Sequence, residues 1–164
     1  MSRENESISI KNKNDGHKQF VNNTSKKLKN LEKIHKTIES DYHTVKMKQI
    51  AVLQMSKFEK NTSHCLKDCQ DLKKTINFEI NRIQKNIDKS DDKISELEYK
   101  KRYYVSNSDK KRAKKYSDYI DMEYIRNRAW SNQLKESKSL LYKTMSLESD
   151  FEELIQTISM RKNY

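Results

Sequence analysis

The sequence contains no proline and only one glycine, Gly16, in 164 residues. Proline and glycine end helices and form the turns that connect strands. An α/β or β-rich fold needs many such turns, so their shortage argues against both classes and favours long helices. Apolar residues are also scarce, at 33%, against roughly 45–50% in an average globular domain. We therefore do not expect one copy of the chain to form a compact core of ordinary size.

The chain also lacks any apolar run near the roughly 20 residues that a bilayer-spanning helix needs. Its first sixteen residues are polar and lack the apolar centre of a signal peptide. We therefore expect an intracellular protein, cytoplasmic or nuclear and not secreted, without a transmembrane segment. In those compartments Cys65 and Cys69 should be reduced thiols.

Apolar residues are spaced alternately by three and four from Leu31 to Tyr104. With Leu31 as heptad position a, fifteen of the twenty-two a and d positions are apolar, and the phase never slips. This spacing predicts a coiled-coil helix over residues 24–104, about 110 Å long if it is continuous. Residues 59–63 are a possible break in it, and residues 1–23, which are polar and show no sustained period, are expected to form a flexible tail.

A second long helix is predicted over residues 109–164, after a bend at 105–108. The short connection favours an elongated, all-α, antiparallel helical hairpin. The firmest apolar stripes of the two helices are the predicted oligomer core, which we expect other coiled-coil chains to cover in a homo- or hetero-oligomer. That core consists of Ile76, Ile80, Ile83, Ile87, Ile94, Leu97, Phe151, Leu154 and Ile158.

Positive charge is concentrated around the predicted bend. Residues 99–116 hold eight bases and one acid, a net +7 out of +11 for the whole chain. Such a cluster predicts contact with an acidic partner, such as nucleic acid, an anionic membrane face or a tubulin tail. A solvated helix junction and a basic import signal at residues 110–115 are the alternatives. The predicted contact residues are Lys100, Lys101, Arg102, Lys110, Lys111, Arg112, Lys114 and Lys115, with Tyr103 and Tyr116 interleaved among them.

No pattern of residues predicts catalysis, a cofactor or a metal. Cys65 and Cys69 have no further ligands at zinc-like spacing, and Glu32 with His35 forms only one of the two Glu-x-x-His motifs of a di-iron bundle. Gly16 alone cannot form a phosphate-binding loop. We therefore expect a protein that is not an enzyme, with no catalytic, cofactor-binding or metal-binding residues.

Two functions fit this sequence. The first is a coiled-coil structural or adaptor subunit of a cytoskeletal, kinetochore-like or trafficking assembly, with the basic aromatic bend as a contact surface. The alternative is a basic helical protein that binds nucleic acid or chromatin through Lys100–Lys115. Binding to duplex DNA that weakens steeply with added salt would favour the second.

Overall fold

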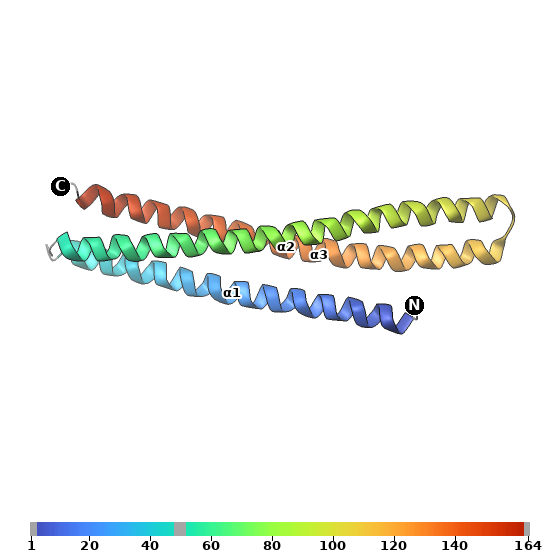
Figure 1. Cartoon of the computed structure of the whole chain (residues 1–164). Coiled ribbons are helices and arrows are strands. Elements are labelled where there is room, and N and C mark those ends of the chain that lie inside the picture. The colour runs from blue at the N-terminus through green and yellow to red at the C-terminus, as the bar shows by residue number, and fades with distance from the viewer. Residues whose placement is uncertain (1–2, 48–51, 163–164) are drawn as a thin grey trace. The chain divides into compact units, whose positions relative to one another are not determined.

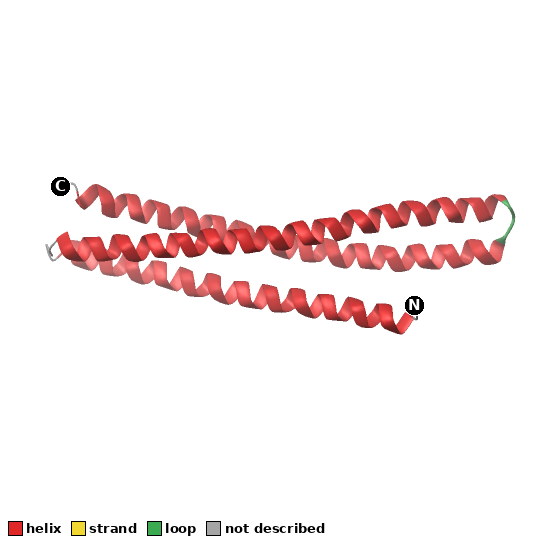
Figure 2. Cartoon of the chain, viewed as in Figure 1, coloured by secondary structure: helices red, strands yellow, loops and turns green. Residues whose placement is uncertain are grey.

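The computed structural model describes residues 3–47 and 52–162 of the chain, and within these ranges only residues 107–109 are not helical. The helices are α1 (Arg3–Met47), α2 (Val52–Ser106) and α3 (Lys110–Lys162) (Figure 1). No strand occurs in the described residues, as the secondary-structure colouring in Figure 2 shows. The predicted all-α class is confirmed.

The chain divides into two compact units. Unit 1 contains Met1–His17 and Phe78–Ser137, and unit 2 contains Lys18–Asn77 and Lys138–Tyr164. Each helix contributes one part of its length to each unit. The same heptad stripe therefore supplies the interior of both units.

In unit 2, α1 and α2 pack against each other. Leu31 of α1 and Leu72 of α2 line one pocket, whereas in a single continuous helix they would lie about 60 Å apart. The prediction of one helix over 24–104 is therefore wrong. Heptad phase shows which face of a helix is apolar. It does not show where one helix ends and the next begins if the spacing of apolar residues continues unchanged between them. The residues between α1 and α2, 48–51, lie outside the described part of the chain.

The predicted tail is also wrong, because α1 begins at Arg3. Helix α1 buries His17 and Thr24 although they lie before or at the start of the expected helix. Each of these polar side chains occupies an inward position that a search for apolar periodicity does not detect. Without proline, nothing in residues 3–23 interrupts the helical backbone, and Gly16 costs a helix only about 1 kcal/mol.

The possible break at 59–63 is not present, since α2 is helical throughout this range. Thr62 is fully buried, and its hydroxyl donates a hydrogen bond to the backbone carbonyl of Phe58 at 2.7 Å. A threonine that bonds to the preceding turn fits inside a helix and has no need to cap a new one. The capping potential of this segment is therefore not used.

The predicted oligomer core is covered by the chain's own helices. Of its nine residues only Ile80 is partly exposed, and the buried ones are Ile76, Ile83, Ile87, Ile94, Leu97, Phe151, Leu154 and Ile158. The chain's own helices cover these side chains because helices that pack on one another need only a narrow apolar stripe each. No second chain is required to bury these side chains.

In unit 1, α2 and α3 pack against each other on either side of the loop at 107–109. The guanidinium of Arg82 lies over the ring of Trp130, and the side chain of Asn127 donates to Asp91 at 2.7 Å. The rings of Tyr104 and Tyr116 meet close to the loop. Residues with higher numbers on α2 contact residues with lower numbers on α3.

Candidate functional site

The loop between α2 and α3 is closed by backbone hydrogen bonds. Ser108 has a φ of 55°, and its N–H donates to the carbonyl of Val105 at 3.1 Å. The N–H of Asp109 donates to the carbonyl of Tyr104 at 2.9 Å. This pair of bonds is the Schellman motif, in which the residue with left-handed backbone is usually glycine. The motif ends α2 and turns the chain within three residues.

Asp109 then starts α3. Its Oδ1 atom accepts a hydrogen bond from the backbone N–H of Arg112 at 3.1 Å, which is the bond of an N-cap residue. Asp109 is the single acid among residues 99–116. The short loop and this cap bring the basic ends of α2 and α3 together.

Tyrosines connect the two helices next to the loop. Tyr104 of α2 stacks on Tyr116 of α3 with ring centroids 5.4 Å apart and planes 12° apart. Tyr103 meets Tyr104 edge-on at 5.3 Å, and Tyr119 meets Tyr116 edge-on at 5.9 Å. Aromatic pairs in these geometries contribute about 0.5–1.5 kcal/mol beyond their buried area. The cluster therefore fixes how the two basic segments face each other.

Three of the bases lie over these rings. Arg112 is 5.5 Å from the centroid of Tyr104, and Lys115 is 5.8 Å from that of Tyr119. Lys100 is 6.0 Å from the centroid of Tyr116. Such cation–π contacts hold the charge at the surface without neutralising it.

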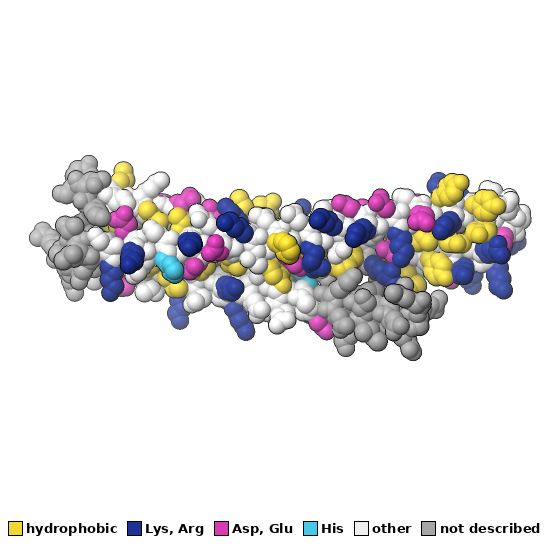
Figure 3. Space-filling model, in the orientation of Figure 1, with side chains coloured by type: hydrophobic (Ala, Val, Ile, Leu, Met, Phe, Trp, Pro, Cys, Tyr) yellow, Lys and Arg dark blue, Asp and Glu magenta, His cyan; other side chains and the backbone are white. Residues whose placement is uncertain are grey.

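Only two of the eight bases have a carboxylate partner in the described part of the chain. Lys100 lies 3.1 Å from Glu96, whose hydrogen bond and charge raise the pKa of the lysine. Arg112 lies 3.6 Å from Asp109. The other six, which we call the tip cations, are Lys101, Arg102, Lys110, Lys111, Lys114 and Lys115. Figure 3 shows Lys and Arg side chains interspersed with hydrophobic ones near this end of α2 and α3.

Four of the tip cations share one face of α3. Lys110, Lys111, Lys114 and Lys115 are spaced one and four residues apart, which places them on one side of a helix. Ala113 lies on the opposite side and is buried. The first turn of α3 contains no acidic residue. These lysines therefore point to solvent at the end of the helix where the backbone dipole is positive.

All ten predicted contact residues lie within this region, and the structure brings those before and after the loop together. Tyr103 is exposed and Tyr116 is half-buried. Sequence analysis missed the contacts of Tyr104 and Tyr119 with the other tyrosines. Paired aromatic residues at three- or four-residue spacing on both sides of a predicted bend would have indicated them.

A second charged cluster lies inside unit 1, around Glu123. This carboxylate is 5% exposed and accepts hydrogen bonds from Ser90 at 2.9 Å and Arg126 at 3.1 Å. Lys93 lies 3.4 Å away. Every group around Glu123 is a structural partner, so this cluster fixes the register of α2 on α3.

His17 joins α1 to the same unit. Its imidazole lies 3.4 Å from Glu79 of α2 and 3.8 Å from Glu136 of α3. Burial alone would raise the pKa of Glu79, but hydrogen bonds and charge from Arg82 and His17 outweigh burial and lower it. Glu79 is thus held ionised by its partners.

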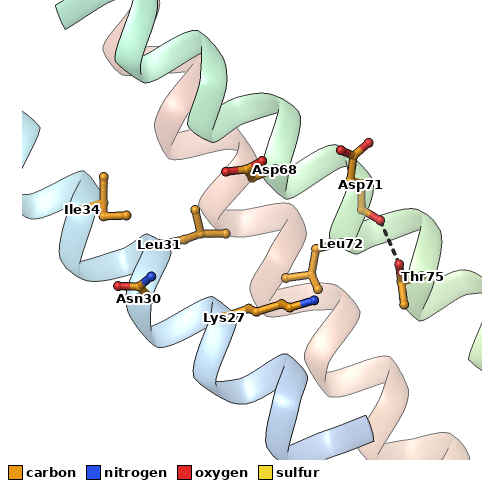
Figure 4. A pocket seen from close by; sticks show the side chains of 8 residues that line it. All are labelled: Lys27, Asn30, Leu31, Ile34, Asp68, Asp71, Leu72 and Thr75. Atoms are coloured by element: carbon orange, nitrogen blue, oxygen red, sulfur yellow. Dashed lines mark hydrogen bonds between the residues drawn. The ribbon is translucent and has the colours of Figure 1, made fainter.

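Unit 2 has a pocket of about 340 Å³ between α1 and α2 (Figure 4). Leu31 and Leu72 point into the space between the two helices, and Lys27, Asp68 and Asp71 surround it. The hydroxyl of Thr75 donates to the backbone carbonyl of Asp71 at 3.2 Å. The side chains form an apolar floor with a rim of both charge signs. No two of these lining residues form a pair of nucleophile and general base.

A pocket of about 390 Å³ between α1 and α3 of unit 2 holds His35, Glu39, His43, Asp150 and Glu153 among its lining residues. His35 is already engaged, since its Nε2 atom donates to the carbonyl of Asp150 at 3.3 Å. In the described ranges no three or more His, Cys, Asp or Glu side chains converge to hold a metal ion. The residue types suit a metal, but their arrangement does not.

Cys65 and Cys69 are buried free thiols in unit 2. Burial raises the pKa of both, that of Cys69 to about 12. The thiolate is the reactive form of cysteine, so these side chains act as small apolar residues at neutral pH.

No protein-family model, curated protein or solved structure matches this chain. Among the described residues, no helix combines the length and the apolar character that crossing a bilayer requires. The function must therefore be argued from the charges and contacts around the α2–α3 loop.

Proposed function

We propose that the protein is a non-enzymatic structural or adaptor subunit of an intracellular assembly, and that the tip cations bind a polyanionic partner surface. The observation that carries the proposal is the position of the lysines at the start of α3. Lys110 and Lys111 lie at the positive end of the helix dipole, beside Arg112 and with no acidic residue in that turn.

The fold itself disfavours this placement. An acidic side chain in the first turn of a helix stabilises it by about 0.3–1 kcal/mol, and a basic one has the opposite effect. The tip cations also have no carboxylate partners in the described residues, so they add no ion pair to folding. Charge that opposes the local helix and has no carboxylate partner in the described residues is best explained by a binding partner that supplies the negative charge.

The helical framework we propose is an antiparallel hairpin of α2 and α3 with coiled-coil packing. Its support is the order of contacts in unit 1, where Arg82 meets Trp130 and Tyr104 meets Tyr116. Burial of a and d residues along α2 supports the coiled-coil part. A hairpin of this kind presents the tip cations at a rigid end held by the stacked tyrosines.

Other chains of the assembly would bind apolar side chains that the fold leaves exposed. The strongest candidates are large residues outside the predicted core: Phe78, Ile125, Tyr142, Met145 and Met160. Their exposure supports protein partners, whether homo- or hetero-oligomeric. The basic surface supports a cytoskeletal, kinetochore-like or trafficking partner of acidic character.

A charge-reversal pair of variants tests the proposal. The clustered variant changes Arg102, Lys110, Lys111, Lys114 and Lys115 to glutamate, which lowers the net charge by ten, from +11 to +1. The matched control reverses five exposed lysines spread over both units and reaches the same net charge. These are Lys26, Lys67, Lys85, Lys135 and Lys143.

Binding of both variants is compared on duplex DNA, a polyglutamate peptide that mimics a tubulin tail, and anionic lipid vesicles. We expect the clustered variant to lose at least tenfold more affinity than the control for one of these polyanions. Equal losses by the two variants would show that bulk charge attracts polyanions and that the tip is not a site. Duplex DNA as the sole responding polyanion would favour the nucleic-acid-binding alternative.

A further inference from the structure

Three uncharged residues lie at the apex of the α2–α3 loop, and the acid that follows them, Asp109, pairs with Arg112 at 3.6 Å. Ser106, Asn107 and Ser108 are polar and exposed. Two apolar or aromatic side chains project beside them, since Val105 is 59% exposed and Tyr103 is 58% exposed. A surface that bound phosphates alone would have no use for an exposed valine next to the loop.

The cations stand one turn behind this apex on both helices. Arg102 lies four residues before Ser106, or about 6 Å along α2, and Lys111 lies in the first turn of α3. Long basic side chains extend along an apolar surface and keep their charge in a polar layer. The tip thus has a polar leading edge, where Asp109 is paired with Arg112, followed by basic side chains on both helices.

The tip cations lie on both α2 and α3, and this distribution determines which kind of polyanion can contact them together. Two packed helices are about 20 Å wide, which is too wide for the major groove of DNA at about 12 Å. A nucleic-acid rod lying along the side of α3 would contact Lys111 and Lys115 but not Arg102 of α2. A flat surface that meets the loop end-on contacts all of them together.

We infer that the polyanion bound by the tip is the anionic headgroup layer of a lipid bilayer, met end-on, with Val105 and Tyr103 entering the interface and the tip cations lying among the lipid phosphates. This inference rests on the proposed function and names its partner. Tyrosine is favoured at membrane interfaces because its ring is apolar and its hydroxyl is polar. Each cation near an anionic membrane surface adds about fivefold to binding.

The contact is peripheral, since only the loop and the first turns beside it enter the interface. Cations and an apolar residue act together here, and either alone binds a bilayer weakly. The two contributions are separable by experiment, because salt screens the charge and leaves the apolar part in place.

The test uses the full chain and sedimentation with vesicles of phosphatidylcholine, with or without about 30% phosphatidylserine. We expect binding to the vesicles that contain phosphatidylserine, at least tenfold weaker binding to neutral ones, and weakening with salt. The clustered charge reversal should abolish binding, while the scattered control retains most of it. Val105→Ser should weaken binding severalfold with little change in its salt dependence. Tyr124→Ser, which changes an exposed aromatic residue elsewhere in unit 1, should leave vesicle binding unchanged.

A label at the apex gives an independent readout. An environment-sensitive dye attached to the Ser106→Cys variant should shift to the blue with anionic vesicles and stay unshifted with duplex DNA. The native thiols at Cys65 and Cys69 are buried, so labelling is selective. The same dye on the Asn132→Cys variant, at an exposed position of α3, should not shift.

The outcomes separate the inference from the proposed function. Binding of DNA or polyglutamate that depends on the clustered charges, without vesicle binding, would overturn the membrane partner and leave the polyanion site standing. Vesicle binding without an effect of Val105→Ser and without a dye shift at position 106 would overturn the end-on contact. Equal behaviour of the clustered and scattered variants on all three polyanions would overturn both proposals.

Discussion

The interiors of the two units are built from different chemistry. The fully buried side chains of unit 2 include Phe151, Ile158 and Thr144, and the threonine hydroxyl is satisfied by its own helix at 2.7 Å. Unit 1 instead buries His17, which pairs with Glu79 of α2, and Glu123, which pairs with Lys93 of α2. The same heptad stripe thus contributes to a mostly apolar core in unit 2 and to a partly ionic core in unit 1.

The two interiors contribute to the fold in different ways. Apolar burial stabilises in proportion to area and tolerates small changes in register. A buried carboxylate does not tolerate a change in register, because moving it away from its partners leaves a buried charge unpaired. Unit 1, which carries the loop and the tip cations, is thereby held in one register on its two long helices.

The largest expected effect is the loss of an aromatic side chain from the interior of unit 2. Phe151→Ala should lower the free energy of unfolding by about 3–5 kcal/mol, through lost burial and the cavity left behind. Phe78→Ala is the matched control in unit 1, because Phe78 is 75% exposed whereas Phe151 is fully buried. Urea denaturation followed by circular dichroism measures both. A similar loss for the two variants would contradict the described burial.

The second effect concerns the ionic interior of unit 1. Glu123→Ala should lower the free energy of unfolding by about 2 kcal/mol, because it removes the carboxylate that accepts hydrogen bonds from the Ser90 hydroxyl and from Arg126. Glu96→Ala, which removes an exposed ion pair with Lys100, should cost less than about 0.5 kcal/mol. If both variants unfold at the same urea concentration, Glu123 does not hold unit 1 together.

The third effect appears only when pH is varied. Because the pKa of Glu79 is lowered in the folded chain, its contribution is present above the unfolded pKa of about 4.3. That contribution is lost as pH falls through the lower folded value. Glu79→Gln should therefore destabilise the protein at pH 7 and have a smaller effect at pH 3. Urea midpoints at the two pH values decide, and an equal effect at both would show that charge is not what Glu79 contributes.

The smallest effect is expected in the loop. Ser108 has left-handed backbone, with a φ of 55°, which costs a residue with a Cβ about 1 kcal/mol relative to glycine. Ser108→Gly should raise the free energy of unfolding by up to about 1 kcal/mol, and Ser108→Val should lower it by more than that. Ser106→Gly is the control, because Ser106 lies in the last turn of α2, where a glycine should lower the free energy of unfolding. Stabilisation by both glycines would contradict the Schellman geometry.

Several a and d residues of α2 are buried, among them Ile76, Ile83 and Ile94, because a three-four spacing identifies one face of a helix irrespective of its neighbours. Tyr42 is also buried although it lies outside the a and d positions. The sequence could not predict that α1 and α2 are separate helices, since the stripe has the same phase on both sides of residues 48–51. It also missed the burial of Glu123, because a glutamate in a chain that is 36% charged has the signature of a surface residue. Two of its partners, Ser90 and Lys93, come from α2, and only the folded chain defines the register of α2 on α3.

The basic cluster was visible before the fold because charge concentration is a property of the sequence alone. Residues 99–116 stand out before any fold is known. The stacking of Tyr104 on Tyr116 was not predictable to the same degree, since it depends on a loop that closes in three residues. The left-handed residue in that loop is Ser108, where the usual signal would be glycine.

We propose that the tip cations serve binding, whereas the interiors of the two units serve folding. Thermal unfolding of the clustered charge-reversal variant separates these two roles, because the variant changes the tip and alters neither interior. We expect a melting temperature equal to that of the unchanged protein or higher, since glutamates at Lys110 and Lys111 suit the positive end of α3. A fall as large as that caused by Phe151→Ala would contradict the claim and show that the basic loop is part of what holds the fold together.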